Sequence, residues 1–207
     1  MCEPENLEQL CSIEPDYVGY IFYQKSKRFV GVSPDPALFK IPPADILKVG
    51  VFVNEEMDQV IQKVDEHQLD LVQLHGNESP GYCGKLMGLG IRVIKAISPG
   101  GVAPGSKIQP CDTEIEDYKE MVQTLLFDTP GPGWGGTGQK FDWSLLKELN
   151  VMLPYILSGG IGPEDAKAIR ELKQKNLRGI DLNSRFELSP GVKDIALLND
   201  FFIEFRK

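Results

Sequence analysis

The feature that most limits what this chain can fold into is a repeated alternation of short apolar runs with amphipathic stretches. The apolar runs are rich in Val, Ile and Phe, and Gly, Pro, Asn or Asp separates each run from the next segment. Strands are predicted at residues 17–22, 47–53, 71–74, 93–96, 125–128, 155–157 and 179–182. Alternating strands and helices indicate an α/β fold with a parallel sheet covered by helices.

The amphipathic stretches carry apolar residues three or four positions apart, which is the spacing of one helix face. They lie at residues 57–64, 80–87, 115–122, 143–149, 163–172 and 195–205. The first element of the chain is also predicted to be a helix, because Pro4 suits its first turn and Leu7, Leu10 and Cys11 form an apolar stripe. The chain therefore opens on a helix rather than on a strand.

A parallel α/β sheet of this length is either an open doubly wound sheet or a closed barrel. A dinucleotide-binding sheet requires a glycine-rich turn after an early strand, whereas here the glycines follow the fifth strand, at positions 131, 133, 135, 136 and 138. We therefore expect one domain over residues 1–207 with a (β/α)8 TIM-barrel fold. Only seven strands are readable, so the barrel is expected to lack its first strand and to be open or rearranged, as a monomer or a homodimer.

Charge and composition exclude several classes of function. The formal net charge is −8, whereas a nucleic-acid surface requires clustered Lys and Arg. No apolar stretch approaches the length of a membrane span and no signal peptide is recognisable, so a cytoplasmic protein is expected. The four cysteines are scattered and there are two histidines, so we expect reduced thiols and no metal site.

Two loops at the carboxyl ends of strands have the composition of a phosphate site. Ser158-Gly159-Gly160 lies between a strand and a helix, and its backbone N–H groups are free of bulky side chains. Asn183-Ser184-Arg185 follows the last strand and could close the same pocket, because many barrels bind phosphate between these last two loops. The alternative is that both segments are ordinary turns.

Three further polar residues follow predicted strands, where a barrel places its active site. Asp128 ends an apolar strand and suits a general acid, although a helix cap or a salt bridge would explain it equally well. His75 follows Val72-Gln73-Leu74, and a lone histidine is more often structural than catalytic. Arg28 offers a planar fork for a carboxylate, although exposed basic loops are usually only solvated.

Taken in order, these segments resemble the phosphoribosylanthranilate isomerase family over essentially the whole chain. The most specific matches are Gly135-Gly136-Thr137-Gly138 followed by Phe141-Asp142-Trp143, and Gln73-Leu74-His75-Gly76 before them. Further matches are Gly19-Tyr20-Ile21-Phe22-Tyr23 with Arg28, Val49-Gly50-Val51-Phe52-Val53-Asn54, Leu157-Ser158-Gly159-Gly160, and Pro190-Gly191-Val192-Lys193-Asp194.

The resemblance implies an aldose–ketose isomerisation, the Amadori rearrangement of N-(5-phosphoribosyl)anthranilate in tryptophan biosynthesis, without metal or organic cofactor. It implies that Asp128 is the general acid and that Arg28 holds the anthranilate carboxylate. The loops at Gly160 and Ser184 would hold the phosphate of this phosphorylated small molecule. His75 and Asp181 would line the same mouth, in roles that the resemblance leaves open.

The family's general base is the cysteine of a K-[IV]-C-G-[MI]-[RT] segment, which is not found in this sequence. An ungapped alignment matches Met1 to the Met position, which puts the catalytic cysteine upstream of residue 1 and predicts weak or no turnover. A gapped alignment makes Cys2 the base. Two other functions stay open: a non-catalytic barrel that binds a phosphate ligand, and a related enzyme such as indole-glycerol-phosphate synthase, whose strand-end lysines are matched here by Lys95 alone.

Overall fold

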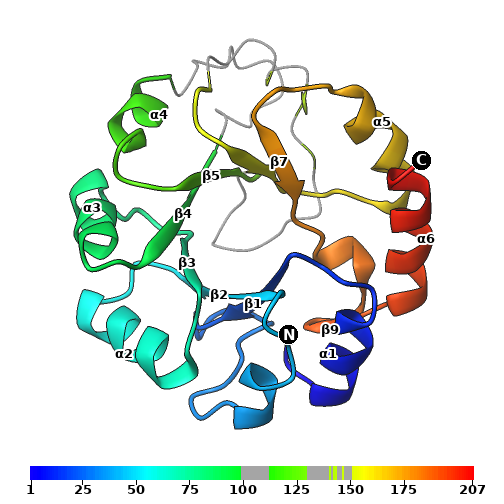
Figure 1. Ribbon diagram of the computed structural model, residues 1–207, viewed down its shortest axis with the longest axis horizontal. Coiled ribbons are helices and arrows are strands. Elements are labelled where there is room, and N and C mark those ends of the chain that lie inside the picture. Colours follow the sequence, from blue (N-terminus) through cyan, green and yellow to red (C-terminus); the bar gives the residue numbers. More distant parts are fainter. Residues whose placement is uncertain (99–111, 130–139, 141, 144–145, 147–150) are drawn as a thin grey trace.

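The computed structural model describes residues 1–98, 112–129, 140, 142–143, 146 and 151–207. At its centre, seven strands lie side by side in sequence order, and each pairs in parallel with the next (Figure 1). They are β1 (Tyr17–Ile21), β2 (Leu47–Phe52), β3 (Leu71–Leu74), β4 (Arg92–Ile97), β5 (Thr124–Phe127), β6 (Tyr155–Leu157) and β7 (Leu177–Ile180). The predicted parallel sheet is confirmed.

Helices form a ring outside the sheet (Figure 1). They are α1 (Pro4–Cys11), α2 (Met57–His67), α3 (Pro80–Gly88), α4 (Asp112–Tyr118), α5 (Ala166–Glu171) and α6 (Ile195–Phe205). Local chemistry sets several starts: prolines occupy the first turns of α1 and α3, and the Ser79 and Asp194 side chains cap α3 and α6 by accepting hydrogen bonds from Tyr82 N and Leu197 N.

Some predicted boundaries differ from the structure. α4 begins and ends earlier than the predicted 115–122, and the segment 163–172 divides into a 3-10 turn, η3 (Pro163–Asp165), and α5. β7 starts two residues before the predicted 179–182 and ends at Ile180. The glycine cluster at 131–138 lies outside the described residues, as do most of the helix predicted at 143–149 and most of the connection 98–112.

Several short elements were not predicted. They are the 3-10 turns η1 (Pro36–Phe39) and η4 (Ser184–Phe186), and the antiparallel hairpin of β8 (Glu187–Ser189) and β9 (Val192–Lys193). The two strands of this hairpin are three and two residues long, too short for an alternating pattern to show in the sequence. The hairpin matters because it brings Glu187 and Lys193 towards the mouth of the barrel.

The core has two layers because successive side chains of a strand point to opposite faces of the sheet. A small inner cluster contains Val49, Leu71, Ile94, Ala96, Leu126 and Ile156. The larger outer cluster packs the other face of the sheet against the helices, with Leu74, Leu86 and Phe127 among its fully buried members. A cavity lies beside the inner cluster and extends from Tyr17 and Leu177, where β1 and β7 start, to the carboxyl ends of the strands.

The sheet does not close on itself within the described residues. β1 pairs with β2 and β7 pairs with β6, but no pairing joins β1 to β7. The amino group of Met1 lies beside β1 and donates a hydrogen bond to Gly19 O over 2.9 Å. The expectation of an open barrel with seven strands is confirmed for this part of the chain.

A buried ion pair fixes the loop after β3. Lys95, on β4, is 2% exposed, and its Nζ donates to Leu74 O, to Gly76 O and to Glu78 Oε2 at 3.2, 2.6 and 3.1 Å. Glu78 in turn accepts from the backbone N–H groups of Asn54 and Gly76. Every hydrogen of the ammonium group has an acceptor. The pair therefore holds the backbone carbonyl groups of Leu74 and Gly76, on either side of His75.

We expect Lys95→Met to lower the free energy of unfolding by about 3 to 5 kcal/mol, because it leaves Glu78 charged and buried without its partner. Urea denaturation of both proteins measures the difference. Lys119→Met removes an exposed partner of Glu116 and should change stability by less than about 1 kcal/mol. If the two substitutions lowered the free energy of unfolding equally, burial of the Lys95 pair would make no difference to stability.

Candidate active site

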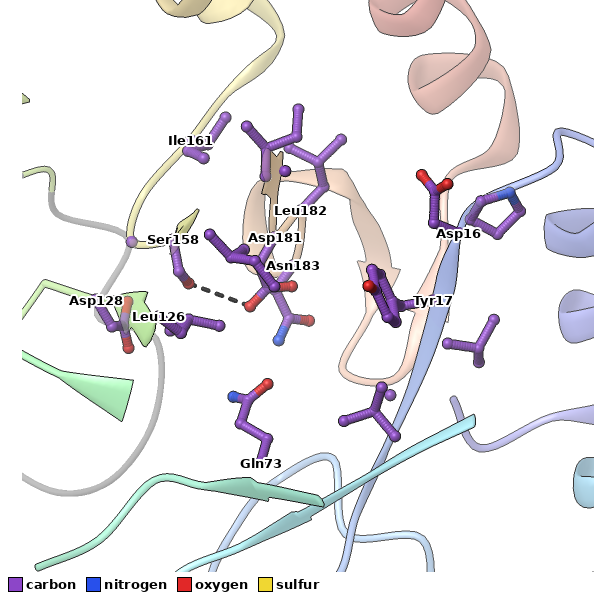
Figure 2. A pocket seen from close by; sticks show the side chains of 18 of the residues that line it. Asp16, Tyr17, Gln73, Leu126, Asp128, Ser158, Ile161, Asp181, Leu182 and Asn183 are labelled. Atoms are coloured by element: carbon purple, nitrogen blue, oxygen red, sulfur yellow. Dashed lines mark hydrogen bonds between the residues drawn. The ribbon is translucent and has the colours of Figure 1, made fainter. Parts of the chain in front are cut away.

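A cavity of about 710 Å³ runs along the opening between β1 and β7, from Asp16 and Leu177 at the starts of these strands to the carboxyl ends of the strands. Polar residues from four strand ends reach it: His75 after β3, Asp128 after β5, Ser158 after β6 and Asp181 after β7. Figure 2 shows Asp128, Ser158 and Asp181 along one side of this space, with the side chain of Gln73 reaching in from β3. The predicted site residues of these four strands are therefore brought together.

His75 and Asp128 are in direct contact. His75 Nε2 lies 3.0 Å from Asp128 Oδ2, and His75 Nδ1 lies 2.9 Å from Gln73 Nε2. The backbone N–H of Thr129 donates to the other carboxyl oxygen of Asp128 over 2.9 Å. Both oxygens of Asp128 thus have a partner at the mouth of the barrel, and Gln73 joins the site although sequence analysis assigned it no role.

Asp181 is a partly buried carboxyl group of the cavity. Ser158 Oγ donates to Asp181 Oδ2 over 3.1 Å, which joins the ends of β6 and β7 (Figure 2). Burial raises the pKa of Asp181 above its usual 3.8, and the nearby Asp128 carboxylate adds to the rise; the charge of Lys193 and the Ser158 hydrogen bond oppose it. Asp181 therefore holds a proton more readily than a solvated aspartate.

Arg28 lines the cavity but is already paired. Its Nε and Nη2 donate to the carboxylate of Glu187 in a two-pronged contact, with the shortest distance 2.6 Å. Glu187, in the short hairpin, is a site residue that sequence analysis missed. A carboxylate ligand would have to use the N–H groups of Arg28 that Glu187 leaves available.

Lys193, in β9 of the same hairpin, is another residue that sequence analysis missed, and it is buried. Its Nζ donates to Leu182 O at 3.0 Å and to Asn183 Oδ1 at 2.9 Å, and lies 3.4 Å from Glu187 Oε1. Burial lowers the pKa of Lys193, against the raising effect of Glu187 and Asp181. Burial alone would raise the pKa of Glu187, but the Arg28 hydrogen bond and the Lys193 charge hold it below its usual range.

The loop predicted to bind phosphate has glycines where the backbone requires them. Gly159 and Gly160 both have positive φ, of 89° and 65°. A Cβ at Gly159 would lie 2.3 Å from Thr129 Oγ1, so this loop packs closely against the end of β5. Ser158, Gly159 and Gly160 all line the cavity.

The second predicted phosphate loop divides. Asn183 and Ser184 line the cavity, and η4 begins at Ser184. Arg185 is not among the lining residues of the described chain: it contacts Gly162 and forms a 3.0 Å ion pair with Glu164. The structure therefore places five of these six predicted residues around one cavity and turns the sixth towards the helix that follows β6.

Cys2 lies beside the Arg28 loop. Its Sγ is 3.6 Å from Arg28 O, and a Cβ at Gly191 would lie 2.6 Å from this sulfur. Met1 is among the lining residues of the cavity, whereas no cysteine of the described chain is. Lys95 is not a lining residue either, because its ammonium group is buried behind the β3 loop.

Comparison with known proteins bears directly on this site. The family model described as N-(5'phosphoribosyl)anthranilate (PRA) isomerase matches residues 2–204. A protein of Parabacteroides distasonis named N-(5'-phosphoribosyl)anthranilate isomerase is 40% identical over 202 residues, which cover 97% of this chain and 88% of that protein. The chain belongs to the N-(5'-phosphoribosyl)anthranilate isomerase family.

Solved structures of N-(5'-phosphoribosyl)anthranilate isomerases share the fold. The crystal structure of the enzyme from Thermotoga maritima superposes with a TM-score of 0.82 at 30% identity, covering 100% of this chain and 95% of that one. Another, in complex with reduced 1-(o-carboxyphenylamino)-1-deoxyribulose 5-phosphate, gives a TM-score of 0.78 at 28% identity, with the same coverage. The resemblance seen in the sequence is confirmed.

Two further observations concern the described part of the chain. No helix there is long and apolar enough to cross a membrane. No group of three or more His, Cys, Asp or Glu side chains in those residues is arranged to hold a metal ion.

We expect Asp181→Asn to stabilise the protein increasingly as pH rises. The raised pKa of Asp181 means that its neutral form fits the fold, so its contribution is complete below the unfolded pKa and is lost as pH rises through the folded value. Asparagine stays neutral throughout. Urea unfolding from about pH 3 to pH 8 should show a difference from the parent protein that widens above the unfolded pKa of about 3.8 and levels off above the folded pKa.

The exposed Asp200 on α6 provides the control. Asp200→Asn should show no such trend with pH, because its carboxyl group is solvated. A difference for Asp181→Asn that stays constant or narrows with rising pH would contradict the assignment of Asp181 as a carboxyl group that burial keeps protonated.

Proposed function

We propose that the cavity at the carboxyl ends of the strands is where this isomerase binds and rearranges N-(5-phosphoribosyl)anthranilate. As a member of its family, the chain is an aldose–ketose isomerase of tryptophan biosynthesis. The observation that carries the proposal is the position of Asp128: its carboxyl group faces the same cavity as the glycine loop after β6. The Asp128 carboxyl group can give a proton to a ligand whose anionic group the glycine loop holds.

Asp128 is proposed as the general acid. It transfers a proton to the ring oxygen of the ribose, the bond from C1 to that oxygen breaks, and the anthranilate nitrogen forms a Schiff base with C1. A general base then removes the proton from C2, which gives an enolamine that tautomerises to the ketone. Protons balance over the sequence, so neither a metal nor an organic cofactor is needed.

The remaining lining residues would anchor the two ends of the substrate. Backbone N–H groups at Gly159 and Gly160, together with Asn183 and Ser184, suit a phosphate dianion. Arg28 suits the anthranilate carboxylate, with Glu187 holding its guanidinium plane in place. Arg185 would act only indirectly, through its pairing with Glu164.

The general base is not proposed to be Cys2. Its sulfur is directed at the carbonyl oxygen of Arg28 and packs against Gly191, while Met1 takes the position on the cavity wall. A cytoplasmic location and a monomeric or homodimeric state remain predictions that accompany the proposal.

Asp128→Asn should lower kcat about 10²- to 10⁴-fold, because asparagine cannot donate a proton to the ring oxygen. Binding of the reduced product analogue, followed by calorimetry, should remain close to that of the parent protein. Asp200→Asn, an exposed residue of α6 that does not line the cavity, should leave both quantities unchanged. Unchanged kcat in Asp128→Asn would remove Asp128 as the acid.

We expect the 207-residue chain to bind the analogue but to turn over its substrate weakly, and Cys2→Ser to leave that turnover unchanged. The steady-state rate of substrate consumption measures both proteins. A normal rate that Cys2→Ser abolishes would make Cys2 the base. Binding without any turnover would favour the second candidate, a barrel that holds a phosphate ligand without chemistry, which the missing thiol in the described cavity wall supports.

A further inference from the structure

Gln73 is a polar residue on the inner face of β3, a position more often filled by an apolar side chain. Its side chain points into the cavity (Figure 2). Gln73 Nε2 lies 2.9 Å from His75 Nδ1, and His75 Nε2 lies 3.0 Å from Asp128 Oδ2. Gln73 and His75 are two residues apart and so share one face of the strand. The three side chains form one series of hydrogen bonds from β3 to the end of β5.

The amide of Gln73 determines where the imidazole proton lies. An amide nitrogen carries two hydrogens and accepts none, so His75 Nδ1 must be the acceptor in this contact. A neutral imidazole that accepts at Nδ1 carries its own proton on Nε2. His75 Nε2 therefore donates to Asp128 Oδ2.

Asp128 then receives a donor on each oxygen, from His75 on one and from the backbone N–H of Thr129 on the other. A general acid becomes a carboxylate once its proton has left, and hydrogen bonds donated to that carboxylate stabilise it. The other tautomer of His75 would instead direct the lone pair of Nε2 at the negative oxygen. The tautomer of His75 thus affects how well the Asp128 carboxylate is stabilised after it has given up its proton.

The surroundings fix the backbone of His75 but not its protonation. The backbone N–H of His75 donates to Phe52 O, and Lys95 holds the next carbonyl, that of Gly76. Of the charged groups that reach the cavity from other strands, Asp181 interacts with both His75 and Asp128, and Lys193 lies near Asp181. None of these groups touches Nδ1, so the choice of tautomer rests with Gln73.

From this geometry we infer that Gln73 is a positioning residue, which holds His75 in the Nε2–H tautomer and thereby orients Asp128 for proton donation. The kinetic part of this inference rests on the proposed function. Its structural part does not, because the tautomer of His75 is measurable without substrate.

Long-range 1H–15N correlation spectra of the 207-residue protein report the tautomer. The chain has two histidines, and His75→Asn assigns the signals by difference. The parent protein should show the His75 proton on Nε2. In Gln73→Glu a carboxylate that only accepts faces Nδ1, so a proton should appear there. Gln123→Glu makes the same charge change on an exposed side chain before β5 and should leave the spectrum unaltered.

Kinetics test the consequence for Asp128. Gln73→Leu removes the donor without adding charge and should lower kcat about 10- to 100-fold, with KM little changed. Gln123→Glu should retain the parent kcat. A rise in KM with unchanged kcat would make Gln73 a substrate contact instead and would overturn its positioning role.

Other outcomes are equally decisive. A proton on Nδ1 in the parent protein, or an unchanged His75 spectrum in Gln73→Glu, would overturn the inference. An altered tautomer with full kcat in Gln73→Leu would break the link from His75 to catalysis. If the parent protein shows no turnover, the proposed function fails for this chain, while the spectra still decide the role of Gln73.

Discussion

The site depends on one constraint, the unbroken parallel order of the strands. Because each strand pairs with its sequence neighbour in the same direction, the carboxyl ends of β3, β5, β6 and β7 meet at one rim. Register matters as much as direction. A slip of one residue in β3 would exchange its faces and turn Gln73 and His75 away from the cavity. The inner cluster of apolar side chains beneath the rim opposes such a slip, because the slip would remove Leu71 from this cluster and turn it to the outer face of the sheet.

Buried charge is the second theme of the structure, and it is used for orientation. A buried ion pair gains little net stability, because removing both charges from water offsets much of their attraction. The Lys95 and Glu78 pair nevertheless determines the path of the β3 loop, and the Arg28 and Glu187 pair determines the plane of a guanidinium group. In both cases more than one contact holds a charged group. The β3 loop and the guanidinium group of Arg28 are each thereby held in one conformation.

The sequence predicted the strands well because each apolar run is bounded by residues that favour turns. The predicted bounds coincide with the structure for β3, β6 and α6. Helix starts with a proline or a capping side chain were also predictable, whereas α4 lacks such a signal in the prediction and was placed three residues late. The local sequence pattern is thus sufficient to predict the ends of a helix or strand where the residue composition changes sharply at those ends.

Contacts between distant segments could not be predicted in this way. Arg28 and Glu187 are 159 residues apart, and only folding shows that the hairpin after β7 meets the loop after β1. Gln73 was read as an ordinary strand residue, although its spacing of two from His75 was a usable signal. The strand-end rule located His75 and Asp128, and the family resemblance pointed to Asp181, but the contacts of these residues with one another required coordinates.

The opening between β1 and β7 gives the barrel an uneven local stability. Leu47 N donates to Asp16 O and Phe22 N to Val51 O, so the even-numbered residues of β1 pair with β2. On the opposite edge Gly19 O accepts from Met1 N and Ile21 O from Val30 N, but no strand of the described chain pairs with β1 there. β3, β4 and β5 are each enclosed by a strand on both sides. Backbone fluctuations that expose amides to solvent should therefore start at β1 and β7 and reach the middle of the sheet last. The backbone at Asp128, after β5, should therefore open to solvent least often. The backbone at Arg28, after β1, and at Asp181, after β7, should open most often.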